Sequence, residues 1–258
     1  MKLTFLGTGT SFGVPQIGCS CDVCRSPDPR DRRTRTSAVI ETDGGTRLLI
    51  DTAPELRLQL IANGIDRVDA VLYTHEHADH THGIDDLRAV SVRRGGAIPM
   101  YGLPRTLEQL EQRFPYIFDD QLRPLPGTSK PEARAHPLRD GERERIGDAD
   151  VLPVTVPHGE LSVLAYRVGP IAYVTDAKRI PGSAVEQFRG VEVLVLNALF
   201  RTAHPTHLSL PEAIEAARAI GAPRTYLTHL THNIRHADLE AELPPGIAPA
   251  FDGLVAKV

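Results

Sequence analysis

The chain has 258 residues, of which 41% are hydrophobic and 24% charged, as in an ordinary globular protein. Its 29 basic and 33 acidic residues give a net charge of −4, which argues against a general affinity for nucleic acid. No apolar run approaches the roughly 20 residues of a membrane-spanning helix. Three cysteines are an odd number for a disulfide framework, and the N-terminus resembles no signal peptide. We therefore expect a cytoplasmic protein.

The N-terminal segment predicts a strand at residues 2–6 that runs into the glycine-rich turn 7–13. The glycine spacing in this turn differs from the dinucleotide-binding fingerprint. Two interpretations stay open. The turn is either purely structural, or it lets the backbone approach a metal ion or an oxyanion.

The next motif is the loop 18–24, which contains Cys19, Cys21 and Cys24. The spacing Cys-x-Cys-x-x-Cys is too tight for internal disulfides and close to that of structural Zn²⁺ knuckles. Three thiolates leave one corner of a tetrahedral zinc site open, so we expect a histidine from elsewhere in the chain. The alternative is three reduced thiols without a metal.

A cluster of arginines follows the cysteine loop. It is either a solvated face, or one or two of its guanidinium groups bind a substrate phosphate. Its members are Arg30, Arg32, Arg33 and Arg35.

Residues 37–42 and 46–51 then predict a β-hairpin through Asp43-Gly44-Gly45. The second strand ends at Asp51, whose carboxylate is suited to hold a metal-binding imidazole in one tautomer. Residues 54–62 predict a helix.

The strand predicted at 69–74 leads into the most informative stretch, His75-Glu76-His77-Ala78-Asp79-His80. On an extended backbone His75 and His77 project to the same side. Asp79 and His80 begin a turn and can face a second point nearby. These donors suit a dinuclear site for Zn²⁺, Mn²⁺ or Fe. A histidine-rich surface loop is the alternative.

The middle of the chain predicts several short elements and one irregular segment. The elements are a helix at 84–91, a strand at 98–102, a helix at 104–114, and a hairpin formed by 134–139 and 142–146. Prolines, charges and polar residues dominate residues 115–134, which we interpret as a surface excursion too short to be a domain.

The second half repeats the pattern of strands that end in a polar side chain. A strand at 151–156 is followed by His158, and the hairpin of 163–168 and 171–175 is followed by Asp176. A buried strand is predicted at 191–197. The last strand, 223–228, is followed by His229.

His207 stands directly before a predicted helix at 211–220, whose start is marked by the capping box of Ser209 and Glu212. The positive potential of a helix N-terminus favours an anion. From there His207 can protonate a leaving alkoxide or donate a hydrogen bond to a phosphoryl oxygen. His204 is a second candidate for this role, and a histidine without a catalytic role is the alternative.

The pattern His-x-His-x-Asp-His after a strand resembles the metallo-β-lactamase-fold hydrolases, over nearly the whole chain. The resemblance implies an α/β fold, an αββα four-layer sandwich of two mixed β-sheets with outer helices. It implies one metallo-hydrolase domain, 1–258, that includes the zinc loop 18–24 and the excursion 115–134. The implied ligands are His75, His77 and His158 for one metal ion, Asp79, His80 and His229 for the other, and Asp176 as the bridge.

The cysteine loop is similar to that of one branch, the phosphoribosyl 1,2-cyclic phosphate phosphodiesterases of the carbon–phosphorus lyase pathway. In that branch a histidine three residues after the last catalytic ligand joins the cysteines. The resemblance therefore implies His232 as the fourth ligand of one structural Zn²⁺. It also places a histidine like His207 before a comparable helix.

We expect a metal-dependent hydrolase of phosphoric diester bonds that uses two catalytic divalent metals, Zn²⁺ or Mn²⁺, to activate water. Asp79, which can orient the nucleophile, and His207 are the candidate catalytic residues. The expected substrate is a small cyclic phosphodiester or nucleotide, nucleic acid is not expected, and a homodimer is compatible with the family.

Two alternatives remain. A transfer-RNA 3′-end processing enzyme would need a long basic insertion. A pyrroloquinoline-quinone biosynthesis-type carrier has a similar cysteine loop but tends to lack the full catalytic set.

Overall fold

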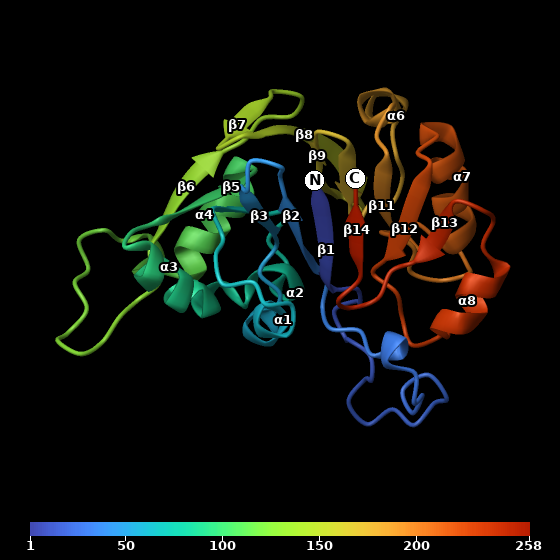
Figure 1. The fold of residues 1–258 in the computed structure, drawn as a ribbon, viewed down its shortest axis with the longest axis horizontal. Helices are drawn as coiled ribbons and strands as arrows, with labels where there is room; N and C mark the ends of the chain where they lie inside the picture. Colours follow the sequence, from blue (N-terminus) through green and yellow to red (C-terminus); the bar gives the residue numbers. More distant parts are fainter.

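The structure is a computed structural model that describes residues 1–258, and two seven-stranded sheets packed face to face form its centre (Figure 1). The first sheet has the order β14-β1-β2-β3-β4-β5-β6. Its strands are β14 (Val255–Lys257), β1 (Lys2–Gly7), β2 (Ser37–Glu41), β3 (Arg47–Ile50), β4 (Ala70–Leu72), β5 (Ile98–Gly102) and β6 (Ala133–Pro137).

The second sheet has the order β13-β12-β11-β10-β9-β8-β7. Its strands are β13 (Ile247–Pro249), β12 (Arg224–Thr228), β11 (Val193–Asn197), β10 (Ile171–Val174), β9 (Leu161–Val168), β8 (Ala149–His158) and β7 (Glu144–Ile146). Both sheets are mixed. Strands β3 to β6 and β10 to β13 run parallel, and the other pairs are antiparallel.

Successive residues of a strand point to opposite faces, so the central strands contribute to two apolar layers at once. In β3, Leu48 lies in the core between the sheets, whereas Leu49 lies in the core under the helices of the first sheet. In β11, Val193 faces the other sheet and Leu194 packs under the helices of the second sheet. Burial on both faces explains why these strands read as continuous apolar runs.

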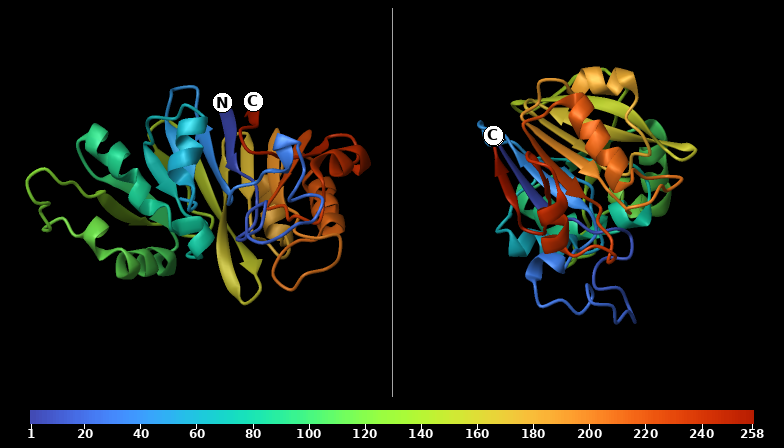
Figure 2. Two further views of the ribbon diagram at one scale, coloured as in Figure 1. Left: turned by 90° about the horizontal axis from the view of Figure 1, so that it is seen from below. Right: turned by 90° about the vertical axis from the view of Figure 1, so that its right-hand side faces the viewer.

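The helices cover the two outer faces, which gives the predicted αββα layers (Figure 2). Those of the first half are α1 (Leu56–Ala62), α2 (Ala78–Thr81), α3 (Arg88–Arg94), α4 (Pro104–Arg113) and α5 (Pro115–Phe118). Those of the second half are α6 (Gly182–Phe188), α7 (Leu210–Ile220) and α8 (His236–Glu242). Two 3₁₀ turns, η1 (Pro29–Asp31) and η2 (Ile84–Leu87), complete the list. No helix has the length and apolar character needed to cross a bilayer.

The predicted hairpin of 134–139 and 142–146 is wrong. Strand β6 runs parallel to β5 in the first sheet, whereas β7 pairs antiparallel with β8 in the second sheet. The turn at Asp140-Gly141 is present, with Gly141 at a φ of 73°, but the chain crosses from one sheet to the other there. The Asp-Gly sequence therefore predicted correctly that the chain turns here, but it did not predict which strands pair.

Other boundaries also differ from the predictions. The helix expected at 84–91 is the 3₁₀ turn η2 followed by α3, which ends at Arg94. The segment 115–134 starts with α5 and ends in β6, and the loop between them projects beyond the edge of the first sheet in light green (Figure 1). Strands β13 and β14 have three residues each, too few to give a periodic pattern.

The loop after α2 passes close to the loop after β3, and Gly83 makes that approach possible. The N–H group of Gly83 donates to the carbonyl oxygen of Thr52 at 2.9 Å. A Cβ atom at position 83 would lie 2.0 Å from the carbonyl oxygen of Ala53. Because that oxygen belongs to the backbone, it has little freedom to move aside.

We predict that Gly83→Ala lowers the free energy of unfolding by about 1–3 kcal/mol, since the added methyl group overpacks this contact. Urea unfolding followed by circular dichroism measures the change. Gly182→Ala is the matched control, because the space around Gly182 is open, and its stability should stay within about 0.5 kcal/mol of the wild type. Equal stability of Gly83→Ala and the wild type would contradict the prediction.

Candidate metal centre

The candidate ligands lie at one edge of the sandwich because they stand at the carboxyl ends of strands that point the same way. His75 and His77 follow β4, and His158 is the last residue of β8. Asp176 follows β10 and His229 follows β12. The two sheets thus deliver side chains from distant parts of the chain to one place.

The first group of donors consists of His75, His77 and His158. One ring nitrogen from each lies within 4.8 Å of the others, and His75 Nε2 is 2.9 Å from His77 Nδ1. The Nδ1 atom of His158 lies 2.9 Å from the carbonyl oxygen of Thr206. A carbonyl can only accept, so Nδ1 of His158 carries the proton and its Nε2 keeps a free lone pair.

The second group consists of Asp79, His80 and His229, whose donor atoms also lie within 4.8 Å of one another. Asp176 stands between the two groups. Its Oδ2 atom is 2.8 Å from His80 Nε2 and 3.4 Å from His75 Nε2, and its Oδ1 atom is 3.1 Å from His229 Nε2. One carboxylate therefore faces both groups, at the place where the resemblance implies a bridging ligand.

The buried nitrogens of this cluster are matched to cations rather than to hydrogen bonds. Both ring nitrogens of His229 and Nε2 of His80 are buried without a hydrogen-bond partner. The short distance between His80 Nε2 and Asp176 does not have the geometry of a hydrogen bond. Because buried polar atoms normally have partners, imidazole nitrogens and carboxylate oxygens in this arrangement fit divalent ions such as Zn²⁺ or Mn²⁺.

The electrostatics of the cluster agree with that fit. Burial lowers the pKa of His75 well below its usual value and that of His229 to about 4, so both rings offer neutral lone pairs. Burial also acts to lower the pKa of His80, but nearby carboxylates, led by Asp176, raise it well above its usual value. The field at this point therefore favours positive charge.

Asp51 orients the imidazole of His80 by a contact with the ring nitrogen that faces away from Asp176. Its Oδ2 atom lies 2.7 Å from His80 Nδ1 and accepts from the Thr74 hydroxyl group at 2.8 Å. Its Oδ1 atom accepts from the Thr74 backbone N–H group at 2.8 Å. With Nδ1 of His80 held in this way, its Nε2 points to Asp176, which is the arrangement the sequence predicts for Asp51.

Three residues of the site have backbone conformations that are unusual for L-residues. Asp51, Asp176 and His229 have φ angles of 59°, 57° and 57°, and all other positive φ angles of the chain belong to glycine. Asp51 and His229 directly follow the last residue of a strand, and Asp176 stands two residues after the end of β10. Such conformations cost about 1–3 kcal/mol each and concentrate at functional sites, where the surrounding structure maintains them.

His207 lies beside both groups, and the predicted capping box of Ser209 and Glu212 begins α7 just after it. Its Nε2 atom is 3.4 Å from Asp176 Oδ1, and its ring stacks on that of His229 with centroids 4.9 Å apart. His204 Nδ1 is 3.4 Å from His207 Nδ1, on the side away from Asp176. His207 is therefore the better placed of the two candidates.

The cysteine loop gathers around the predicted fourth ligand. The Sγ atoms of Cys19, Cys21 and Cys24 lie 3.3, 3.4 and 3.6 Å from His232 Nδ1. A tetrahedral Zn²⁺ ion with ordinary bond lengths places sulfur and nitrogen ligands about 3.5 Å apart. A backbone hydrogen bond from Cys24 lowers the pKa of Cys21 to about 6, whereas burial raises the pKa of Cys24 to about 11. This donor set fits a structural zinc ion.

Of the arginine cluster, Arg33 has a role that the sequence did not reveal. It is 1% exposed and donates to the carbonyl oxygens of Thr231 and Ile234 and to Asp31. Arg30 and Arg35 pair with carboxylates, so the structure does not support a phosphate-binding role for them. Arg33 ties the N-terminal loop to the segment that carries both His229 and His232.

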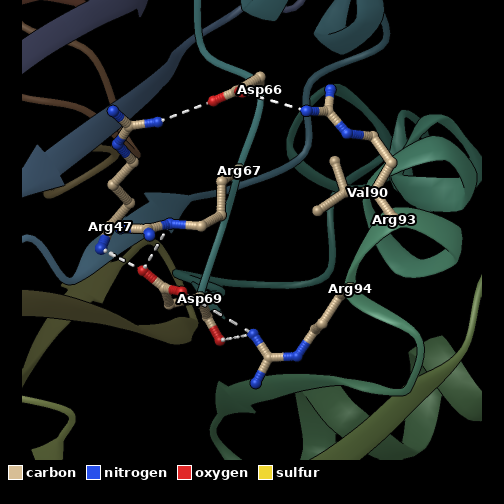
Figure 3. Close-up of a pocket in the computed structure, with 7 residues that line it drawn as sticks. All are labelled: Arg47, Asp66, Arg67, Asp69, Val90, Arg93 and Arg94. Atoms are coloured by element: carbon tan, nitrogen blue, oxygen red, sulfur yellow. Dashed lines mark hydrogen bonds and ion pairs between the residues drawn. The ribbon is translucent and has the colours of Figure 1, made fainter.

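A charged hollow at the opposite edge of the first sheet is not part of this site (Figure 3). Four arginines line it, and each pairs with Asp66 or Asp69. The four are Arg47, Arg67, Arg93 and Arg94. Because each guanidinium group has a carboxylate partner, this network connects β3 and the loop before β4 to α3, which is a structural role.

Comparison with known proteins agrees with the fold. The sequence profile of the beta-lactamase superfamily domain matches residues 46–230. The architecture is thus the metallo-β-lactamase fold. The zinc-bound structure of PqqB from Methylobacterium extorquens has the same fold, with a TM-score of 0.81 at 19% identity and complete coverage of both chains.

A diphosphatase from the PhnP family has a crystal structure that matches with a TM-score of 0.90 at 41% identity. The match covers 100% of this chain and 97% of that one. The chain belongs to the PhnP family of the beta-lactamase superfamily, which confirms the resemblance drawn from the histidine and cysteine motifs.

An octanoyltransferase of Porphyromonas gingivalis is also 41% identical, over 263 residues. That match covers all of this chain and 52% of the relative, so the chain spans about half the length of that protein.

Asp51→Asn is predicted to weaken metal binding at the His80 group by about 10- to 100-fold, since the imidazole loses the carboxylate that fixes its tautomer. Asparagine keeps the size of the side chain and tolerates a positive φ. Zinc titration of the metal-free protein in competition with a chelator measures the affinity. Asp43→Asn, at an exposed carboxylate in the β2–β3 turn, is the control, and equal affinities of the two variants would refute the role given to Asp51.

Cys24→Ser is predicted to lower the zinc content by about one ion per chain, because a hydroxyl group replaces a thiolate ligand. The loop should then be cleaved faster by trypsin at the exposed Arg25. Elemental analysis and timed proteolysis measure the two effects. Ser20→Ala, which changes an exposed residue of the same loop, should behave as the wild type. An unchanged zinc content in Cys24→Ser would rule out this site.

Proposed function

We propose that the chain is a metal-dependent phosphodiesterase that hydrolyses a small phosphoric diester, such as a phosphoribosyl 1,2-cyclic phosphate or a cyclic nucleotide. The observation that carries the proposal is the position of Asp176. Its Oδ2 atom lies 3.4 Å from His75 of the first group and 2.8 Å from His80 of the second. Its Oδ1 atom lies 3.1 Å from His229 of the second group and 3.4 Å from His207 Nε2. This arrangement suits an attack on phosphorus between two cations with a proton donor at hand.

Two catalytic ions, Zn²⁺ or Mn²⁺, fit the donor groups, and a separate structural Zn²⁺ fits the cysteine loop. When bound, a pair of such ions lowers the pKa of water and neutralises the charge of the phosphoryl oxygens. The catalytic ligands are His75, His77, His158, Asp79, His80 and His229, with Asp176 shared between the groups.

The chain's own residues then handle the protons. Hydrolysis forms a bond between the water oxygen and phosphorus and breaks the bond between phosphorus and the leaving oxygen. Asp79, with a side chain 16% exposed, orients the attacking water and accepts the proton that it loses. The leaving oxygen keeps the bonding electron pair and takes the proton from Nε2 of His207. A linear diester gives an alcohol and a phosphate monoester, whereas a cyclic diester opens to a single phosphate monoester that carries the released hydroxyl group.

A diphosphate is the second candidate substrate, because the PhnP-family relative at 41% identity is a diphosphatase. Both substrates contain a phosphorus atom with two ester or anhydride oxygens, and the same donor groups would accept either. They differ in the leaving group. A phosphate leaves more readily than an alkoxide, so a diphosphate would depend less on proton donation by His207.

The other functions are less well supported. A carrier role, as in a coenzyme PQQ synthesis protein, gives no reason for two complete donor groups and His207 to converge. RNA processing finds no support in a net charge of −4. Acyl transfer needs a nucleophile, and all three cysteines gather around His232 instead of the candidate site. We assign the octanoyltransferase activity of the Porphyromonas relative to the half that this chain does not match. A cytoplasmic location and a homodimer stay predictions.

His75→Ala is predicted to abolish hydrolysis of bis(p-nitrophenyl) phosphate by zinc- or manganese-loaded protein, because it removes a donor that faces both His77 and Asp176. We expect a fall in kcat/KM of at least about 100-fold. Release of p-nitrophenolate measures the rate. His82→Ala changes an exposed histidine of the same loop outside both groups and should keep the activity. Equal rates for the two variants, or no turnover by the wild type, would refute the enzyme proposal.

The substrate class is tested by assaying the wild type with a phosphoribosyl 1,2-cyclic phosphate, a cyclic nucleotide and a nucleoside diphosphate under the same conditions. We expect the highest kcat/KM for one of the cyclic diesters. Preference for the diphosphate would replace the diester proposal with the second candidate.

A further inference from the structure

Thr206 lies in the loop between β11 and α7 and contacts three histidines. Its carbonyl oxygen is 2.9 Å from His158 Nδ1. Its hydroxyl oxygen is 2.8 Å from His207 Nδ1 and 3.2 Å from His204 Nδ1. One residue therefore links a candidate metal ligand with the candidate proton donor.

We propose that Thr206 is a positioning residue, which fixes the ring of His158 through its backbone and the ring of His207 through its side chain. The inference rests on the proposed phosphodiesterase function. It makes that function depend on the β11–α7 loop, which carries Thr206.

The hydroxyl group determines which way His207 faces. The ring of His207 lies nearly parallel to that of His229, with an interplanar angle of 13°, so stacking fixes its plane. Stacking alone leaves the ring free to flip, which would exchange its two edges. The hydrogen bond between Thr206 and Nδ1 selects the orientation in which Nε2 faces Asp176.

The hydroxyl group also determines where the proton of His207 stays. A hydroxyl group has one proton to donate and can accept at its lone pairs. It can accept from Nδ1–H of His207 while it donates to Nδ1 of His204. When Nε2 of His207 gives its proton to the leaving oxygen, the Nδ1 proton remains in the bond to Thr206. His204 thus acts as the acceptor that orients the hydroxyl group, and not as the rival proton donor.

The methyl group of Thr206 explains why the hydroxyl group points to the histidines. A Cβ atom at Gly159 would lie 2.9 Å from the Thr206 Cγ2 atom. The methyl group therefore packs against the backbone of the β8–β9 turn, directly after His158. This contact occupies one side of the threonine and leaves the hydroxyl group directed to His207.

The test separates the hydroxyl group from the methyl group. Thr206→Val keeps the shape and removes the hydroxyl group, and Thr206→Ser does the opposite. The substrates are aryl phosphodiesters whose leaving phenols range from p-nitrophenol to phenol, assayed with metal-loaded protein. For Thr206→Val we expect a loss in kcat that grows along the series to about 10-fold or more for phenol, with KM unchanged. Thr206→Ser should recover most of the loss.

Thr202→Val is the matched control, because Thr202 is an exposed threonine of the same loop. It should leave kcat unchanged across the series. A loss in Thr206→Val that is uniform for all leaving groups, or a Thr206→Ser variant as impaired as Thr206→Val, would overturn the inference.

A readout independent of turnover keeps this inference separate from the proposed function. Long-range ¹H–¹⁵N NMR spectra of zinc-loaded protein report which ring nitrogen of each histidine carries the proton. Thr206→Val should change the spectrum of His207 and leave that of His158 unchanged, because the bond to His158 comes from the backbone. An unchanged His207 spectrum would refute the positioning role. If the wild type hydrolyses no diester and the His207 spectrum still changes, the proposed function fails and the positioning role stands.

Discussion

The buried carboxylate of Asp176 is the point on which the metal centre depends. It lies between donors from both sheets, with His75 and His80 on one side and His229 on the other. Burial of an ionised carboxylate is unfavourable unless opposite charge or hydrogen bonds compensate it. Cations bound by the two donor groups would supply that compensation. The two sheets must therefore stay in a fixed relation, because a small displacement of either would separate Asp176 from half of its partners.

The residues at the strand ends aim their side chains into the site, and this costs free energy in their backbone conformations. Asp51, Asp176 and His229 each take a positive φ within two residues of the end of a strand, a conformation that L-residues avoid. The apolar layer between the sheets and the layers under the helices hold the preceding strands in place. The packing of the apolar core therefore determines where the side chains at the strand ends lie. The core maintains three strained residues that aim their side chains into the same space.

The N-terminal loop lies outside the donor groups but contacts the segment that carries His229. His229 and His232 are three residues apart, so a zinc ion bound by Cys19, Cys21, Cys24 and His232 would brace the segment that carries the candidate ligand His229. Arg33 reinforces this link through the carbonyl oxygens of Thr231 and Ile234. A structural metal at this position would thus act together with the buried guanidinium group on the position of His229. Thr206, in the β11–α7 loop, positions the rings of His158 and His207 in a similar way.

The sequence by itself determined the parts of this protein that depend on neighbours in the chain. The apolar strands that end in a polar residue, the spacing of His75 to His80, and the capping box before α7 are local patterns. They led to the family and, through the resemblance, to its layers. Tertiary structure alone decided the rest. Strands β6 and β7 separate into different sheets because pairing depends on which strand edges are free, which no local turn reveals. Arg33 gains its role from the carbonyl oxygens of residues about 200 positions away, and Thr206 gains part of its role because its own carbonyl oxygen contacts His158. Neither contact leaves a pattern in the sequence.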